Sequence, residues 1–147
     1  MDGLNQVAAL LDLAPLEHEG GLFRQTHADQ WSSSIYYAVG GDEFSALHRL
    51  SSAEVYHYYA GDPLNLLVLY PDGASDQVTL GPDLARGQRP QFRVAPGAWQ
   101  GSTSSGAWSL VGTTMAPPFA WDGFELGSAA LAVRYPTLAG RIKELVR

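Results

Sequence analysis

The sequence predicts an all-β protein, an antiparallel sandwich or barrel of about eight to ten short strands with a helix at each end. Runs of β-branched and aromatic residues recur along the chain, separated by Gly, Pro, Asp and Ser turn signals at intervals of roughly 8–12 residues. The 147 residues are 46% hydrophobic and 16% charged. That composition suffices for one core, so we expect residues 1–147 to form a single domain.

The predicted elements follow in chain order. Leu4, Val7 and Leu11 recur at helical spacing ahead of Pro15, which predicts an amphipathic helix. A Gly-Gly turn then precedes a strand that carries Phe23 and Arg24. Further strands are expected over residues 32–39, 44–49, 54–60, 64–70, 77–80, 90–95, 107–115 and 119–126, and a second amphipathic helix over 137–147.

Composition excludes several classes of function. The net charge of −6 opposes binding to nucleic-acid phosphates and anionic lipid. The chain has no cysteine, which excludes disulfides, zinc-thiolate sites and thiol nucleophiles. The first fifteen residues lack a basic region, and polar residues interrupt their apolar positions, so they resemble neither a signal peptide nor a membrane span. We therefore expect a cytoplasmic protein with no nucleic-acid or membrane partner.

Residues 44–70 concentrate the chemically active side chains. His48, Glu54 and His57 lie among four tyrosines, in three predicted strands joined by tight turns. Such hairpins bring the histidine, glutamate and tyrosine side chains close together. This stretch is the predicted site.

The same stretch resembles the first conserved motif of the cupin superfamily, G(x)5HxH(x)3-4E(x)6G. His48, Glu54 and Gly61 match its pattern, whereas Leu50 stands where a second histidine would be. The later stretch RVAPGAWQGSTS echoes the second cupin motif, with Gln100 at the position of its histidine.

Five blocks in order, from EGGLFRQT to WSLVGTTMAPPFAWDGFEL, look like the small single-domain cupins classed as a domain of unknown function. The resemblance implies a jelly-roll β-barrel flanked by helices, a homodimer, and kinship in fold with epimerases that act on nucleotide-linked 4-keto sugars.

Two kinds of chemistry fit the predicted site. His48, Glu54 and His57 form a two-histidine, one-carboxylate set that could hold a divalent metal as cofactor. In a regular strand, however, Glu54 and His57 face opposite ways, so both point inward only across a bulge. Alternatively, these three residues and Tyr59 are catalytic acid–base groups, with His48 as base and Tyr59 or Tyr36 as acid. A hydrogen-bonded polar cluster around an empty pocket would look the same in sequence.

The ligand-binding candidates lie outside this set. We expect pocket roles for six residues: Glu19, Arg24, Tyr36, Gln91, Trp99 and Gln100. Arginine suits planar contacts with anions, so a phosphorylated or nucleotide-linked sugar is the ligand this set would favour. Three functional classes stay open: an epimerase- or isomerase-like enzyme acting on a sugar or nucleotide-sugar, a metal-dependent oxygenase or hydrolase, and a non-catalytic small-molecule binding module.

Overall fold

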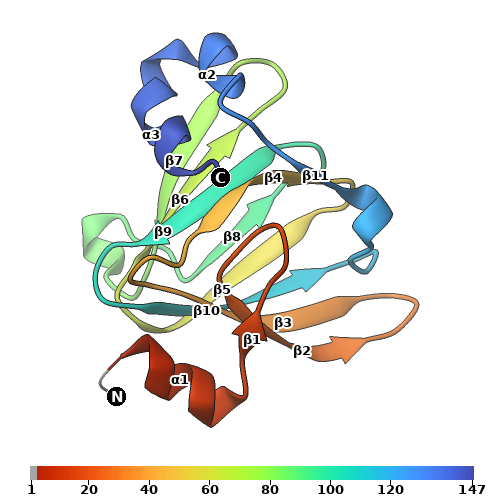
Figure 1. Ribbon diagram of the computed structural model, residues 1–147, viewed down its shortest axis with the longest axis vertical. Helices are drawn as coiled ribbons and strands as arrows, with labels where there is room; N and C mark the ends of the chain where they lie inside the picture. The colour runs from red at the N-terminus through yellow and green to blue at the C-terminus, as the bar shows by residue number, and fades with distance from the viewer. Residues whose placement is uncertain (1–2) are drawn as a thin grey trace.

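The computed structural model describes residues 3–147 as a sandwich of two antiparallel β-sheets of the jelly-roll type (Figure 1). The six-stranded sheet has the order β1 (Ala14–Pro15), β2 (Leu22–Ala28), β3 (Ser33–Val39), β10 (Ser109–Met115), β5 (Glu54–Gly61) and β8 (Gln91–Val94). The five-stranded sheet has the order β11 (Phe124–Leu126), β4 (Ser45–Leu50), β9 (Trp99–Ser104), β6 (Leu64–Leu69) and β7 (Ser75–Leu80). The predicted all-β architecture is confirmed.

Alternation along the strands fills the space between the sheets. Leu64, Leu66 and Val68 of β6 are buried there in one cluster with Tyr37 of β3 and Val111 of β10. The intervening β6 residues, such as Leu67, face the other way and are buried as well. Because β6 is covered on both faces, its sequence LNLLVL is nearly continuous in apolar residues.

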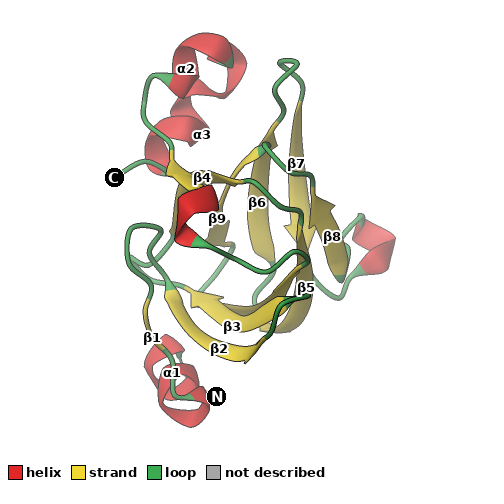
Figure 2. Ribbon diagram, turned by 90° about the vertical axis from the view of Figure 1, so that its right-hand side faces the viewer, coloured by secondary structure: helices red, strands yellow, loops and turns green. Residues whose placement is uncertain are grey.

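Helices cover the outer faces of both sheets. Helix α1 (Leu4–Leu11) places Val7 against Ala38 and Leu110 on the six-stranded sheet. Helices α2 (Leu131–Arg134) and α3 (Ala139–Glu144) cover the five-stranded sheet, where Ile142 and Leu145 are fully buried. Figures 1 and 2 show α1 and the α2–α3 pair at opposite ends of the molecule. Helices α1 and α3 were predicted, the latter as a longer segment over residues 137–147, whereas α2 was not. Within the described chain, no helix is long and apolar enough to cross a membrane.

Two strand predictions need correction. Of the strand expected over residues 119–126, only Phe124–Leu126 pairs; the preceding residues form a loop and a short 3₁₀ helix, η2 (Trp121–Gly123). Conversely, β9 was not predicted, because its sequence WQGSTS is poor in β-branched and apolar residues. β9 lies between β4 and β6, and a Cβ at Gly101 would stand only 3.1 Å from the Ser45 carbonyl oxygen. That close packing favours glycine at this position.

Candidate functional site

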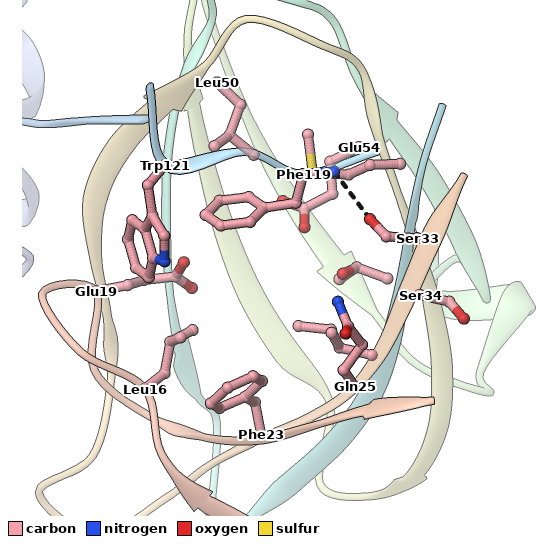
Figure 3. Close-up of a pocket in the computed structure, with 13 residues that line it drawn as sticks. Leu16, Glu19, Phe23, Gln25, Ser33, Ser34, Leu50, Glu54, Phe119 and Trp121 are labelled. Atoms are coloured by element: carbon pink, nitrogen blue, oxygen red, sulfur yellow. Dashed lines mark hydrogen bonds between the residues drawn. The ribbon is translucent and has the colours of Figure 1, made fainter. Parts of the chain in front are cut away.

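A cavity of about 380 Å³ opens between the sheets, at the lower end of the range for small-molecule sites. Its lining is mostly apolar and aromatic, with six polar residues (Figure 3). The apolar residues are Leu16, Phe23, Ile35, Leu50, Met115, Phe119 and Trp121, and the polar ones are Glu19, Gln25, Ser33, Ser34, Glu54 and Thr113. Of the ten site residues predicted from sequence, Glu19 and Glu54 line this cavity.

Segments far apart in sequence build the cavity. β3, β10 and β5 supply Ser33, Thr113 and Glu54 from neighbouring strands of one sheet. Glu19 comes from the turn between β1 and β2, and Trp121 from the loop before β11. The carboxyl groups of both glutamates turn toward the cavity in Figure 3.

Glu54 is the group most strongly perturbed by this environment. Glu54 is buried, with only 8% of its surface exposed. Burial, and then the nearby charge of Glu19, raise its pKa from the ordinary 4.5 to about 7, although His48 and hydrogen bonds from Thr113 and Gln100 act in the opposite direction. Glu54 can therefore accept or donate a proton near neutral pH, which a general acid–base group requires.

Gln100 holds Glu54 from behind the cavity wall. The Tyr56 hydroxyl donates a hydrogen bond of 2.5 Å to the Gln100 Oε1 atom. Because Oε1 is engaged, the amide NH₂ of Gln100 is the end that can donate to Glu54. Both Tyr56 and Gln100 are about 1% exposed, so this chain of hydrogen bonds is shielded from water.

His48 adjoins Glu19 in the same buried region. Its Nδ1 atom lies 2.7 Å from the Ala46 carbonyl oxygen, which can only accept, so Nδ1 carries a hydrogen. Its Nε2 atom lies 3.5 Å from Glu19 Oε1, a favourable ionic contact when Nε2 is also protonated. The other Glu19 oxygen accepts a 2.8 Å hydrogen bond from the Ser45 hydroxyl. His48, Glu19, Glu54 and Gln100 are thus the predicted site residues that the structure brings together.

Five predicted site residues lie elsewhere, on the outer face of the six-stranded sheet. Arg24, Tyr36, His57 and Gln91 occupy one row across it, because strand pairing aligns Arg24 with Tyr36, Tyr36 and His57 with Gly112, and His57 with Gln91. Tyr59 packs over Gly112 in this row.

The side chains of this row make contacts outside the cavity. His57 contacts Thr114 and Gln91 at 3.3 Å, and Arg24 forms an exposed ion pair with Asp12. The prediction that these five residues line the pocket is therefore corrected. In β5, Glu54 and Tyr56 point inward, which turns His57 outward. A bulge could turn both side chains inward only if it lay between Glu54 and His57. The observed bulge lies beyond His57, where pairing shifts between Leu110 and Val111 opposite Tyr58 and Ala60.

Trp99 is also outside the cavity. It precedes the inward-facing Gln100 in β9 and therefore faces outward, against the cluster under the C-terminal helices. The Arg49 guanidinium lies 4.7 Å from its ring centroid. Its role is packing, which corrects the predicted pocket role.

The predicted metal set does not assemble. His57 lies on the opposite face of β5 from Glu54, and Gln100 stands where cupins resembling this chain would carry a further histidine. Residues 3–147 hold no group of three His, Asp or Glu side chains that could bind a metal ion. The residues present therefore do not fit a metal cofactor, and we derive no chemistry through one.

Several cavity residues were not predicted. Gln25, Ser33 and Thr113 are polar residues whose strand positions face the cavity, and their position is evident only once the strand register is known. Phe119 and Trp121 were assigned to a strand, whereas they form a wall of the cavity.

Comparison with known families decides what kind of protein carries this cavity. Residues 5–127 match the family model described as Cupin superfamily (DUF985). The chain belongs to the cupin superfamily. No curated protein matches this cupin.

Solved structures agree with that assignment. A protein from Shewanella oneidensis is 34% identical to this cupin, with a TM-score of 0.92 over 100% of this chain and 99% of the other. A hypothetical protein from Leishmania major is 27% identical, with a TM-score of 0.88 over 99% of each chain. A dTDP sugar isomerase from Desulfovibrio desulfuricans is 18% identical, with a TM-score of 0.58 over 79% of this chain and 87% of the other. At that identity the isomerase shares the fold alone.

Proposed function

We propose that this cupin is an isomerase- or epimerase-like enzyme that binds a small ligand in the cavity and moves a proton with Glu54. The observation that carries the proposal is a buried carboxyl group at the cavity wall whose pKa is raised to about 7. Such a group is found in both protonation states at neutral pH, so it can take a proton from a ligand and return it.

The lining narrows the ligand class. No lysine or arginine is among the described residues that line the cavity, and Arg24, the predicted phosphate contact, lies on the outer face. Two carboxyl groups would repel a phosphate. We therefore expect a sugar-like or carbonyl ligand, as an epimerase would bind, but one without the phosphate or nucleotide group that the sequence favoured.

The residues divide the work of proton transfer. Ionised Glu54 takes a proton from a hydroxyl-bearing carbon next to a carbonyl group of the ligand, and the electron pair of the broken C–H bond moves onto the carbonyl oxygen to form an enediolate. The ligand's hydroxyl proton then moves to that oxygen, and protonated Glu54 delivers its proton to the former carbonyl carbon, so that the carbonyl and hydroxyl groups exchange places. Gln100 and Thr113 orient the carboxyl group by hydrogen bonds. His48 acts through Glu19, whose position it fixes from behind. Phe119 and Trp121 limit the access of water to the reacting group.

Hydrogen exchange with solvent tests the proposal. Unphosphorylated sugars and hydroxy ketones are screened for a rise in melting temperature, and those that bind are incubated with the enzyme in D₂O. Deuterium should enter the ligand with the wild-type protein and not with Glu54→Gln, which should still show the rise in melting temperature. Glu17→Gln, a change at an exposed carboxylate of the turn that carries Glu19, is the matched control and should exchange normally.

Two results would contradict the proposal. Exchange that persists in Glu54→Gln would remove Glu54 from the reaction. A ligand that stabilises the protein but never gains deuterium would assign the cavity to a non-catalytic binding module.

A further inference from the structure

Resting on the proposed function, we propose that the ligand of this cavity carries a protonated amine on an apolar or aromatic body, with the ammonium group beside Glu54 and Glu19. Three features of the cavity support the inference independently of any relative: its hydrogen-bonding balance, its charge and its aromatic wall.

The two carboxyl groups of the cavity are hydrogen-bond acceptors when ionised. Glu19 and Glu54 present four carboxylate oxygens, more acceptor capacity than their protein partners fill. The Ser33 hydroxyl accepts a 2.9 Å hydrogen bond from the Phe119 backbone N–H and keeps its own O–H as a donor, as Gln25 keeps its amide donors, so the excess of acceptors is confined to the two carboxyl groups. A ligand that satisfies this surface must mainly donate hydrogen bonds, as an ammonium group with three N–H bonds does.

The charge of the buried groups points the same way. When both are ionised, Glu19 and Glu54 carry two negative charges, of which His48 could balance at most one. No basic side chain within the described residues lines the cavity to balance the other. An uncompensated buried charge is costly, and the raised pKa of Glu54 reflects that cost. A bound ammonium group would supply the missing positive charge.

The aromatic wall beside these carboxyl groups suits an apolar body. Phe119 and Trp121 pack edge to face with ring centroids 4.9 Å apart, and Trp121 packs in the same manner on Phe124 at 5.1 Å. Phe23 and Leu16 also line the cavity and, in Figure 3, lie across it from Phe119. Aromatic faces attract cations as well as apolar groups, so the wall is compatible with both parts of the proposed ligand.

The amine also suits the proton transfer. A positive charge beside Glu54 lowers its pKa and so holds the carboxyl group in its basic, ionised form. The other titratable groups near Glu54 are Glu19, His48, Tyr37 and Tyr56, and burial raises the pKa of both tyrosines well above 10, which keeps them neutral. Glu54, whose pKa is raised to about 7, is the group whose titration we expect to govern amine binding.

Three compounds of nearly equal shape test the inference. Calorimetry at pH 8 compares 2-phenylethylamine, 2-phenylethanol and phenylacetate, which carry a cation, a neutral hydroxyl and an anion on the same phenyl body. The amine should bind at least tenfold more tightly than the alcohol, and phenylacetate should not bind. Below pH 7 the affinity for the amine should fall by up to tenfold per pH unit, because protons compete for Glu54, whereas the alcohol should show no such fall.

Variants identify the group responsible. Glu54→Gln should lower the affinity for the amine to that for the alcohol and leave the alcohol unaffected, which also shows that the variant is folded. Glu17→Gln should bind all three compounds as the wild type does. Equal affinity for amine and alcohol in the wild type, binding of phenylacetate, or no binding of any of the three at millimolar concentration would each overturn the inference.

Failure here is distinguishable from failure of the proposed function. Deuterium exchange into a neutral carbonyl ligand, together with no preference for the amine, would overturn the amine and keep Glu54 as the acid–base group. Binding of the amine with Glu54 dependence, but no exchange into any amine ligand, would support the amine site and refute the catalysis.

Discussion

Replacing Glu54 with glutamine should stabilise the protein, and by an amount that depends on pH. In the unfolded chain the carboxyl group titrates near 4.5, whereas in the folded protein its pKa is about 7. A raised pKa in the folded state means that the folded protein holds its proton more tightly. The contribution of Glu54 to stability is therefore fully present below pH 4.5 and is lost as the pH rises through 7.

The size of the effect follows from the two pKa values. A tenfold change in proton affinity corresponds to about 1.4 kcal/mol. The rise in the pKa of Glu54 from 4.5 to about 7 therefore lowers the free energy of unfolding by about 3 kcal/mol above pH 7. Between pH 5 and pH 8 the loss should be about 2 to 3 kcal/mol, or about 5–10 °C in melting temperature for a chain of this length.

Urea unfolding of the wild type and Glu54→Gln at several pH values measures this directly. Glutamine cannot ionise, so the stability of the variant relative to the wild type should grow with pH over this range. Any hydrogen bond lost through the substitution adds a term that does not vary with pH. Glu17→Gln, at an exposed position, should show no such growth. A difference in stability that is the same at pH 5 and pH 8 would refute the burial argument for Glu54.

Three further predictions test the packing around the site and the assembly. Tyr56→Phe should cost about 1–3 kcal/mol, measured by urea unfolding, because it leaves the buried Gln100 oxygen without its donor. Gly40→Ala should lower the free energy of unfolding by about 3 kcal/mol or more, because its Cβ would clash with backbone atoms of the β9–β10 loop. Gly112→Ala should cost only about 1 kcal/mol, because the side chain that its Cβ would meet, Tyr59, is half exposed and can move away. Similar losses for the two variants would contradict this reasoning. Sedimentation should give a homodimer of twice 15.8 kDa, and a monomer at micromolar concentration would count against it.

The fold could be predicted from sequence because most strands carry a recognisable local pattern of residues. Alternation and turn residues located β3, β5, β6 and β10 within a few residues of their observed bounds. β9 could not be found in this way. Its Gly101 and serines are present because neighbouring strands crowd it, and that crowding depends on the whole sheet.

The candidate site was predictable only in part, for a related reason. Periodicity shows that Glu54 and His57 face opposite ways, but it does not show which faces the interior, nor where a bulge falls. Glu19 and Glu54 converge on one cavity although 34 other residues separate them in the chain, and nothing in the local pattern of either residue specifies the other. Conversely, His57 and Tyr59 were predicted to share a site with His48 only because the three residues are close in sequence.

The neighbouring strands β3, β5 and β10 each divide into two functional parts. Toward one end of the sheet they supply Tyr37 and Val111 to the apolar core, and toward the other they supply Ser33 and Glu54 to the cavity, with Tyr56 and its pairing partner Thr113 between the two. Because stability is concentrated at the first end, the second can change its side chains without dismantling the first. Divergence between relatives of this fold should therefore gather within two or three residues of one strand terminus, and a library randomised there could acquire new ligands while still folding.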